Sequence, residues 1–211
     1  MLYDCSQLAE RDRGITAAIE AVQRGDLVVL PTDTIYGIGA DAFKAWSVNS
    51  LQNATGRGRN APPSVLVGSR HTLDGLVYAL PAVARSLVEA FWPGALTLVV
   101  EHAPSLQWDL GDTQGTVAVR MPLHPVALEV LRETGPMAVS SAKKQGEPSA
   151  LTATEARDQL GYAVSVYLEA GPGQASLTST IVDVTGDVPR VLRTGAIPLD
   201  QLREVVPEMT G

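Results

Sequence analysis

The chain has 211 residues, of which 45% are hydrophobic and 18% charged, as expected for a globular protein with a full core. Its formal net charge of −7 disfavours a general nucleic-acid-binding protein, because such binding depends on cations that neutralise phosphates. With no apolar stretch near the roughly 20 residues of a membrane span, no secretory signal and a single cysteine, Cys5, we expect a cytoplasmic protein.

Apolar residues at helical spacing appear first over 13–24, where Ile15, Ala18 and Val22 share one face. Gly25 ends this helix, and the apolar run that follows predicts a buried strand that stops at Pro31. The same signals predict, in chain order, a strand over 27–30, a helix over 42–54, a strand over 64–67, a helix over 81–91 and a strand over 96–101.

The second half continues the alternation and then changes. The patterns predict a strand over 116–121, a helix over 125–134, a strand over 137–140, a helix over 154–160, and strands over 164–169, 180–184 and 188–193. Because the last third is rich in strands, the pattern favours a mixed, twisted sheet flanked by helices, an α/β (α+β) fold. No linker or repeat interrupts the chain, so we predict a single domain over 1–211 with a core at about 10–200.

Polar segments follow several of these strands, where open α/β sheets commonly bind ligands. The first carries Thr32, Asp33 and Thr34, which suit an amine, a hydroxyl or a metal, and Gly37 and Gly39, which allow close approach of a ligand to the backbone. A plain turn with a helix N-cap is the alternative. The segment is neither a Walker A loop nor a dinucleotide fingerprint, because the required Gly-Lys-Ser/Thr and third glycine are missing.

Arginines mark the next two segments. Arg57 and Arg59 are flanked by glycines, and their forked guanidiniums suit bidentate contact with phosphate. Arg120 lies inside an apolar strand, where an arginine needs a partner, and a structural salt bridge and a ligand contact are equally open. The remaining polar segments are 140–149, which holds hydroxyls, two lysines and a glycine, and 179–180 together with 193–195.

Other common sites are not indicated. His71, His102 and His124 are scattered, without the spacing of a metal site. Asp109 and Asp112 lie in a turn rich in Gly and Asp, where capping is a better interpretation than a catalytic carboxylate pair. No Gly-x-Ser-x-Gly nucleophile elbow is present in the sequence.

Taken together, the polar segments resemble one family, the YrdC-like domain of the L-threonylcarbamoyladenylate synthases. The resemblance covers nearly the whole chain in the family's order and spacing, and the chain is similar to the short form that has no extra C-terminal domain. The matching pieces are 30–42 (LPTDTIYGIGADA), 91–98 (FWPGALTL), 117–126 (VAVRMPLHPV), 140–142 (SSA) with 146–148 (GEP), 179–183 (STIVD) and 191–197 (VLRTGAI).

The resemblance implies a YrdC-like fold with a concave polar cleft, and an enzyme that joins L-threonine, bicarbonate and ATP into threonylcarbamoyl-AMP and pyrophosphate. This product starts the threonylcarbamoyladenosine modification of tRNA. Mg²⁺ is implied as a cofactor carried by ATP, with no metal ligand from the protein alone. Partner proteins of tRNA modification are implied as well.

Residue roles also follow from the resemblance. It places Thr34, Arg120 and Ser179 at positions that contact threonine, and it implies catalytic roles for Arg57, Ser141 and Lys143. The positions that contact ATP are those of Arg57, Thr116, Ser141, Ser149 and Arg193. The chemistry agrees, because a guanidinium suits a carboxylate and adenylation requires positive charge around the phosphates.

Two positions depart from the family's pattern, which has lysine at the position of Thr55 and asparagine at that of Lys143. In one account Lys143 reaches the same phosphate from the opposite wall and the synthase activity persists, which is the account we favour. In the other, the chain is a weakened paralogue that binds ATP or threonine. A third hypothesis, a module that binds structured RNA such as double-stranded RNA or tRNA, is disfavoured by the low pI of about 4.9.

Overall fold

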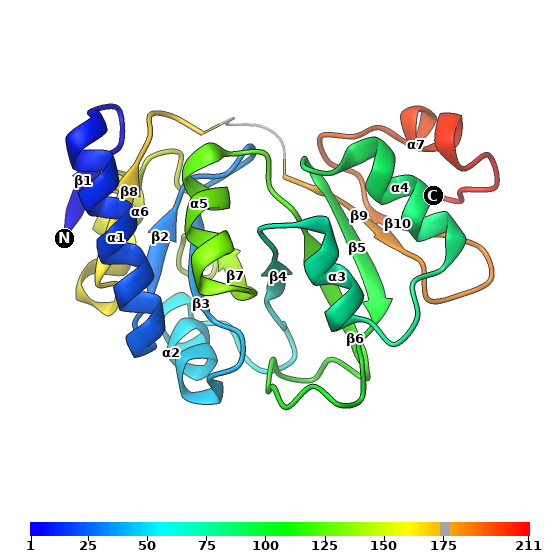
Figure 1. Ribbon diagram of the computed structural model, residues 1–211, viewed down its shortest axis with the longest axis horizontal. Coiled ribbons are helices and arrows are strands. Elements are labelled where there is room, and N and C mark those ends of the chain that lie inside the picture. The colour runs from blue at the N-terminus through cyan, green and yellow to red at the C-terminus, as the bar shows by residue number, and fades with distance from the viewer. Residues whose placement is uncertain (174–177) are drawn as a thin grey trace.

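The computed structural model describes residues 1–173 and 178–211, and its strands form a mixed sheet (Figure 1). Ten strands of the described residues lie in the order β1-β8-β2-β3-β7-β4-β6-β5-β9-β10. Their bounds are β1 (Leu2–Asp4), β2 (Val28–Leu30), β3 (Gly37–Asp41), β4 (Ser64–Leu66), β5 (Leu96–Glu101), β6 (Thr116–Arg120), β7 (Met137–Ser141), β8 (Val166–Glu169), β9 (Thr180–Asp183) and β10 (Arg190–Arg193).

Parallel and antiparallel pairs both occur in this sheet, which confirms the predicted mixed architecture. The pairs β1–β8, β2–β8, β4–β6 and β5–β9 are parallel, and the remaining neighbours are antiparallel. Long crossovers are needed to bring parallel strands together, and helices supply most of them. As a result, segments that are far apart in the sequence meet near the centre of the sheet.

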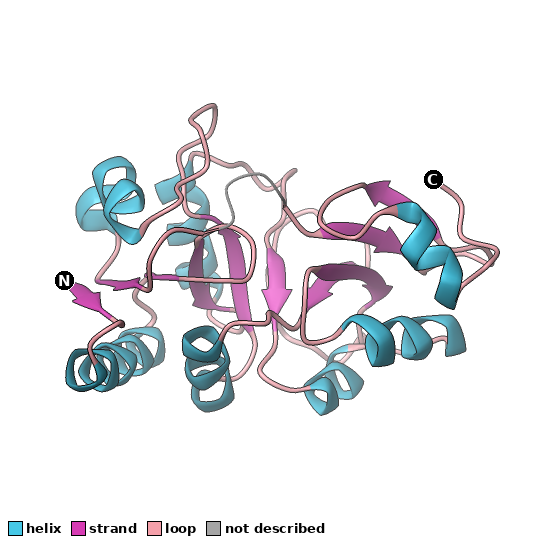
Figure 2. Cartoon of the chain, turned by 90° about the horizontal axis from the view of Figure 1, so that it is seen from above, coloured by secondary structure: helices cyan, strands magenta, loops and turns pink. Residues whose placement is uncertain are grey.

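Helices cover both faces of the sheet (Figure 2). They are α1 (Leu8–Arg24), α2 (Ala45–Thr55), α3 (Arg70–Leu76), α4 (Ala82–Phe91), α5 (Pro125–Thr134), α6 (Ala153–Leu160) and α7 (Leu199–Val205), with a 3₁₀ turn at Gly161–Ala163. Val28 and Leu30 of β2 pack with the core beneath α1 and α5, and Val29 packs with the core beneath α2 and α6. Burial on both faces explains why this strand reads as a continuous apolar run.

Strand β3 was not predicted, because its glycines suggested a loop. In the structure Gly37 pairs with Ser141 and Gly39 with Val139 on β7. A Cβ atom on Gly39 would lie 2.5 Å from Cε of Met137, so the space left by this glycine is filled by a core side chain. The prediction that Gly39 opens the backbone to a ligand is therefore wrong, whereas Gly37 does border the cleft described below.

Candidate active site

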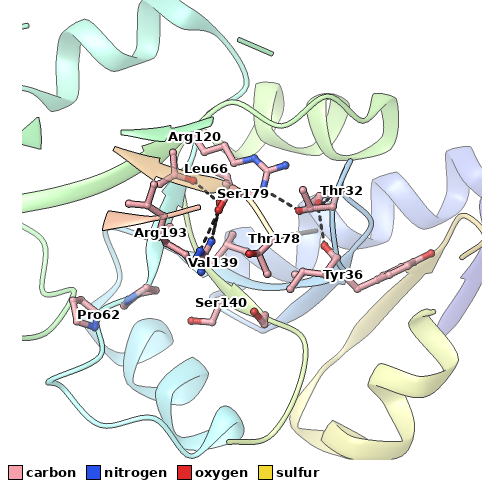
Figure 3. Close-up of a pocket in the computed structure, with 18 of the residues that line it drawn as sticks. Thr32, Tyr36, Pro62, Leu66, Arg120, Val139, Ser140, Thr178, Ser179 and Arg193 are labelled. Carbon is pink, nitrogen blue, oxygen red and sulfur yellow. Dashed lines mark hydrogen bonds between the residues drawn. The ribbon is translucent and has the colours of Figure 1, made fainter. Parts of the chain in front are cut away.

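A cleft with about 710 Å³ of empty space, open to solvent, lies over the centre of the sheet (Figure 3). It is bordered by residues from β3, β4, β5, β6, β7, β9 and β10 and from the segments that adjoin them. The lining residues are Thr32, Thr34, Ile35, Tyr36, Gly37, Arg57, Pro62, Pro63, Ser64, Leu66, Thr97, Arg120, Val139, Ser140, Ser141, Thr178, Ser179, Ile181 and Arg193. Arginine, serine and threonine supply most of its polar groups, and none of the described lining residues is acidic.

Arg120 is held at the end of β6 by three hydrogen bonds, and together with Asp33 and Thr34 it forms what we call the Arg120 corner. Its Nε donates to the carbonyl of Gly94 at 2.9 Å, Nη1 to Thr34 Oγ1 at 3.0 Å, and Nη2 to Asp33 Oδ1 at 2.6 Å. The side chain is almost completely buried, at 6% exposure. Burial lowers the pKa of Arg120, and the adjacent carboxylate of Asp33 opposes this effect.

The hydroxyls beside Arg120 have defined directions. Thr32 Oγ1 donates to the carbonyl of Ile35 at 2.7 Å, so Thr34 is the donor in its 3.1 Å contact with Thr32 Oγ1. Asp33 Oδ1 accepts a second hydrogen bond, at 2.9 Å, from the backbone N–H of Leu123. The structural salt bridge raised for Arg120 is therefore confirmed, and because the residue also borders the cleft, the ligand contact stays a prediction.

Ser179 and Arg193 form a second group on the cleft wall (Figure 3). Arg193 donates from Nη2 to the Ser179 carbonyl at 2.7 Å and to Ser179 Oγ at 3.0 Å. Ser179 Oγ also accepts from Thr97 Oγ1 at 2.8 Å, which leaves the serine's own proton available to a ligand. Burial lowers the pKa of Arg193, and the nearby positive charges of Arg120 and Arg57 lower it further.

Arg57 contrasts with these residues, because its guanidinium makes no hydrogen bond or ion pair within the described part of the chain. It follows the C-terminal end of α2, and its backbone N–H donates to the carbonyl of Gln52 at 2.9 Å. Ser140 and Ser141 border the same cleft from β7, and the buried Oγ of Ser140 has no partner among the described residues. Converging guanidiniums with free donors form a site for an anion.

Other cations of the same segments are committed to the fold. Arg59 donates to both carboxylate oxygens of Asp109, from Nη1 at 2.9 Å and from Nη2 at 2.8 Å. Arg70 donates to the carbonyl of Trp92 after the last turn of α4. Arg59 does not line the cleft and its guanidinium is already paired bidentately, so the phosphate contact suggested for it is without support here and stays a prediction. Asp109 does cap its turn, as predicted, by accepting from the N–H of Gly111 at 3.1 Å.

The fold brings together six of the residues singled out from the sequence, which come from distant parts of the chain. They are Thr34, Arg57, Arg120, Ser141, Ser179 and Arg193. Thr116 does not line this cleft; it borders a neighbouring hollow that shares Pro62 and Pro63, and its Oγ1 donates to the carbonyl of Thr113 at 2.9 Å. Ser149 also lies outside the cleft lining, half-buried beyond β7.

Lys143 and Thr55 are the two departures from the family's pattern. The side chain of each donates a hydrogen bond to a backbone carbonyl outside the cleft. Lys143 Nζ donates to the carbonyl of Glu147, 2.5 Å away in its own loop, and the residue does not line the cleft. Thr55 is fully buried in the last turn of α2, where its Oγ1 donates to the carbonyl of Leu51 at 2.9 Å. The roles that the resemblance implies for Lys143, Thr116 and Ser149 stay predictions.

Thr97 and Ser140 are among the polar cleft residues that had no individual role in the sequence interpretation. Thr97 interrupts the apolar strand β5 and is 2% exposed, so its position as the single polar residue within 96–100 was a usable signal. Ser140 appeared in the sequence only as part of a motif. Nothing in the sequence shows that its hydroxyl is buried without a partner among the described residues, whereas that of Ser141 is not. Whether the side chains of Thr97 and Ser140 reach the cleft depends on which face of their strands borders it.

Within 1–173 and 178–211, no cluster of three or more His, Cys, Asp or Glu side chains is placed to bind a metal ion. In the same ranges no helix combines the length and the apolar character needed to cross a membrane.

Comparisons with known proteins agree with this geometry. The Sua5/YciO/YrdC family model, described as telomere recombination, matches residues 20–195. A Mycobacterium tuberculosis protein provisionally named a threonylcarbamoyl-AMP synthase is 59% identical, covering 97% of this chain and 94% of its own length. The threonylcarbamoyl-AMP synthase of Bacillus subtilis is 34% identical, and the match covers 95% of this chain and 58% of that protein.

A solved structure is similar over the full chain. The Pyrococcus abyssi Sua5 protein complexed with L-threonine aligns with a TM-score of 0.91 at 30% identity, covering 100% of this chain and 62% of that protein. The Escherichia coli YciO structure aligns with a TM-score of 0.82 over 96% of this chain and 97% of its own, but at 22% identity it supports the fold alone.

Proposed function

Because the chain belongs to the Sua5/YciO/YrdC family, we propose that it is a threonylcarbamoyl-AMP synthase that joins L-threonine, bicarbonate and ATP. The product would serve the threonylcarbamoyladenosine modification of tRNA. One observation carries the proposal: Arg57, Arg120 and Arg193 converge with serine and threonine hydroxyls on one cleft of an acidic protein. A cytoplasmic location is part of this proposal.

Threonine would bind at the Arg120 corner and Ser179. The guanidinium of Arg120 keeps N–H groups beyond those that bind Thr34 and Asp33, and these suit the amino acid's carboxylate. Ser179 can donate its proton to a ligand oxygen, because its Oγ already accepts from Thr97 and Arg193. The Asp33 carboxylate fixes the guanidinium, so the ligand would meet a preorganised donor.

The phosphates of ATP would lie against Arg57, Arg193 and Ser141. In the adenylation step a carbamate oxygen of N-carboxylated threonine attacks the α-phosphorus, and the bond to the β-phosphate oxygen breaks to release pyrophosphate. Negative charge grows on the leaving group, and fixed cations in a cleft stabilise it. Because the carbamate is short-lived, holding it beside ATP is a large part of the catalysis. We assign no general base.

Mg²⁺ is proposed as a cofactor that enters with ATP. The cleft lining offers hydroxyls and guanidiniums and no acidic residue, so its donor set fits a metal held mainly by phosphate oxygens rather than by a protein cage. Ser141 lines the cleft and would be the nearest candidate in this proposal to add a hydroxyl to such a metal. When bound, the ion would neutralise phosphate charge.

We propose that synthase activity persists without a lysine at position 55. Lys143 donates to the Glu147 carbonyl of its own loop and would have to give up this bond to reach the phosphates. The arginines of the cleft supply the positive charge instead. The weakened paralogue remains the competing account, and it predicts binding without turnover.

The experiment is direct. The purified chain is incubated with L-threonine, bicarbonate, Mg-ATP and pyrophosphatase, and phosphate release that depends on threonine is measured. Release that disappears without threonine or bicarbonate supports the synthase. No release by the natural sequence, together with release by the Thr55→Lys, Lys143→Asn variant, would favour the binding-only paralogue.

A further inference from the structure

Arg59, which the sequence presents as a twin of Arg57, holds two loops together beside the cleft. It pairs bidentately with Asp109, at 2.9 and 2.8 Å, and its Nε lies 3.6 Å from Oδ1 of Asp112. We call residues 56–61 the Arg57 loop and residues 109–112 the clamp turn. The ion pair therefore links segments about fifty residues apart in the sequence.

Backbone contacts reinforce this ion pair. The N–H of Asp112 donates to the carbonyl of Arg59 at 2.8 Å. Gly111 has a φ of 102°, and a Cβ atom there would lie 2.6 Å from the Arg59 carbonyl oxygen. Only glycine permits this approach, because an L side chain would both collide and be strained at that φ. The clamp turn is thus shaped to receive the backbone of Arg59.

The anchored loop carries Arg57 at one end and cleft residues at the other. Arg57 N donates to the carbonyl of Gln52, while Pro62 and Pro63 follow the loop and line the cleft. The guanidinium of Arg57 has no partner of its own among the described residues, so its position depends on the loop backbone. Between α2 and the prolines, the contact of Arg59 with the clamp turn is the principal tie to the rest of the fold.

We propose that Arg59 and Asp109 form a clamp that positions the Arg57 guanidinium for the phosphates of ATP, an inference that rests on the proposed function. Arg59 is thus a positioning residue, and it acts through the Arg57 loop rather than on the substrate. A Coulombic clamp between two half-exposed side chains adds little to global stability. Its effect should therefore fall on ATP binding.

The test measures ATP and threonine dependence separately in Arg59→Ala and Asp109→Asn. We expect the KM for ATP to rise about 10-fold while the KM for threonine stays within about twofold, because a displaced loop misplaces one phosphate contact. Thermal unfolding of each variant is followed in parallel and should change little. Arg85→Ala, which removes an exposed arginine paired with Asp74 far from the cleft, is the matched control and should leave both KM values unchanged.

Charge exchange tests the pair itself. If the clamp is electrostatic, Arg59→Asp combined with Asp109→Arg should recover much of the ATP affinity that each single change loses, a coupling that a double-mutant cycle measures. Equal rises in both KM values, a KM for ATP within about twofold of the natural sequence, or strictly additive single changes would each overturn the clamp. Calorimetric titration with ATP alone gives the same comparison if the natural chain shows no turnover, so failure of the synthase assignment is distinguishable from failure of the clamp.

Discussion

Arg120 and Arg57 border the same cleft, but their surroundings are opposite. All three nitrogens of the Arg120 guanidinium are hydrogen-bonded to groups of the protein, and the residue is 6% exposed. Arg57 is half-buried, and its guanidinium has no partner in the described part of the chain. A buried charge is tolerated only when paired, so Arg120 is part of the fold as well as of the site. Arg57 is free to serve a ligand.

This difference separates the energetic roles of two residues of one type. Removing a paired, buried ion leaves its partner uncompensated, whereas removing an unpaired, solvated one costs the fold little. The Arg120 corner should therefore couple activity to stability, and the Arg57 loop should keep them apart.

Arg120→Ala should give the largest effect. The carboxylate of Asp33 would keep only the N–H of Leu123 as a partner, which we expect to lower the free energy of unfolding by about 3–5 kcal/mol. Threonine binding should be lost as well, because its carboxylate would lack the guanidinium. Urea unfolding and calorimetric titration with threonine measure the two effects.

The control variant also removes the carboxylate of Asp33, which loses its ion-pair partner in Arg120→Ala. Arg120→Ala combined with Asp33→Ala should recover part of the stability without recovering threonine binding. A single Arg120→Ala variant that unfolds within about 1 kcal/mol of the natural sequence would contradict the structural role given to this ion pair.

Arg57→Ala should affect activity alone. We expect threonine-dependent pyrophosphate release to fall about 10²–10³-fold, the range seen when one charge-stabilising donor is removed. The free energy of unfolding should stay within about 0.5 kcal/mol, because the guanidinium makes no contact that the fold needs. The activity of Arg57→Lys should lie between those of the natural sequence and Arg57→Ala, since lysine keeps the charge but cannot make the two parallel hydrogen bonds of a guanidinium. A large loss of stability with a small loss of turnover would reverse the comparison.

The regular part of the fold could be predicted from sequence. The strand Leu96–Glu101 and the helix Pro125–Thr134 were predicted with the bounds found in the structure, because apolar patterning and the flanking Pro or Gly mark their ends. β3 was missed because its glycines are explained only by Met137 and Val139, residues of a strand about a hundred positions later. The short helices α3 and α7 lack enough turns for a periodic signal.

The candidate site was also predictable only in part. The resemblance indicated which polar segments meet, and the cleft contains most of the residues it implied. Sequence could not tell Arg57 from Arg59, because the difference lies in the pairing of Arg59 with Asp109, fifty residues further along the chain. It also could not predict that Lys143 bonds to its own loop, since that depends on the local turn at Gly146.

Thr97 and Ser140 allow the same comparison of a paired and an unpaired group to be made with neutral hydroxyls. Thr97→Val removes a buried donor to Ser179 Oγ, so we expect a loss of about 1 kcal/mol in the free energy of unfolding. Ser140→Ala removes a buried oxygen that has no partner, so stability should be unchanged or rise by up to about 1 kcal/mol. Urea unfolding of both variants decides this, and a cost for Ser140→Ala equal to that of Thr97→Val would show a bond that the structure lacks.

The smallest predicted effect is a pH dependence that arises from His124, a residue that senses the charge of Asp33. Burial lowers the pKa of His124 below its ordinary value of 6.5; the charge of Asp33 opposes the shift and that of Arg11 adds to it. The buried Nδ1 has no described partner, so protonation would add a donor without an acceptor. Because the unfolded chain then binds the proton more readily, His124 contributes stability above about pH 6.5 that is lost as the pH falls through the lowered value.

His124→Asn isolates this contribution, since it keeps a polar atom near the position of Nδ1 but does not titrate. The free energy of unfolding of the natural sequence should decline between about pH 7.5 and 5.5, and the decline should be shallower in the variant. Arg57→Ala should leave the slope unchanged, because Arg57 lies outside the set of charges that act on His124. Equal slopes for the natural sequence and His124→Asn would contradict this prediction and assign the acid sensitivity to another group.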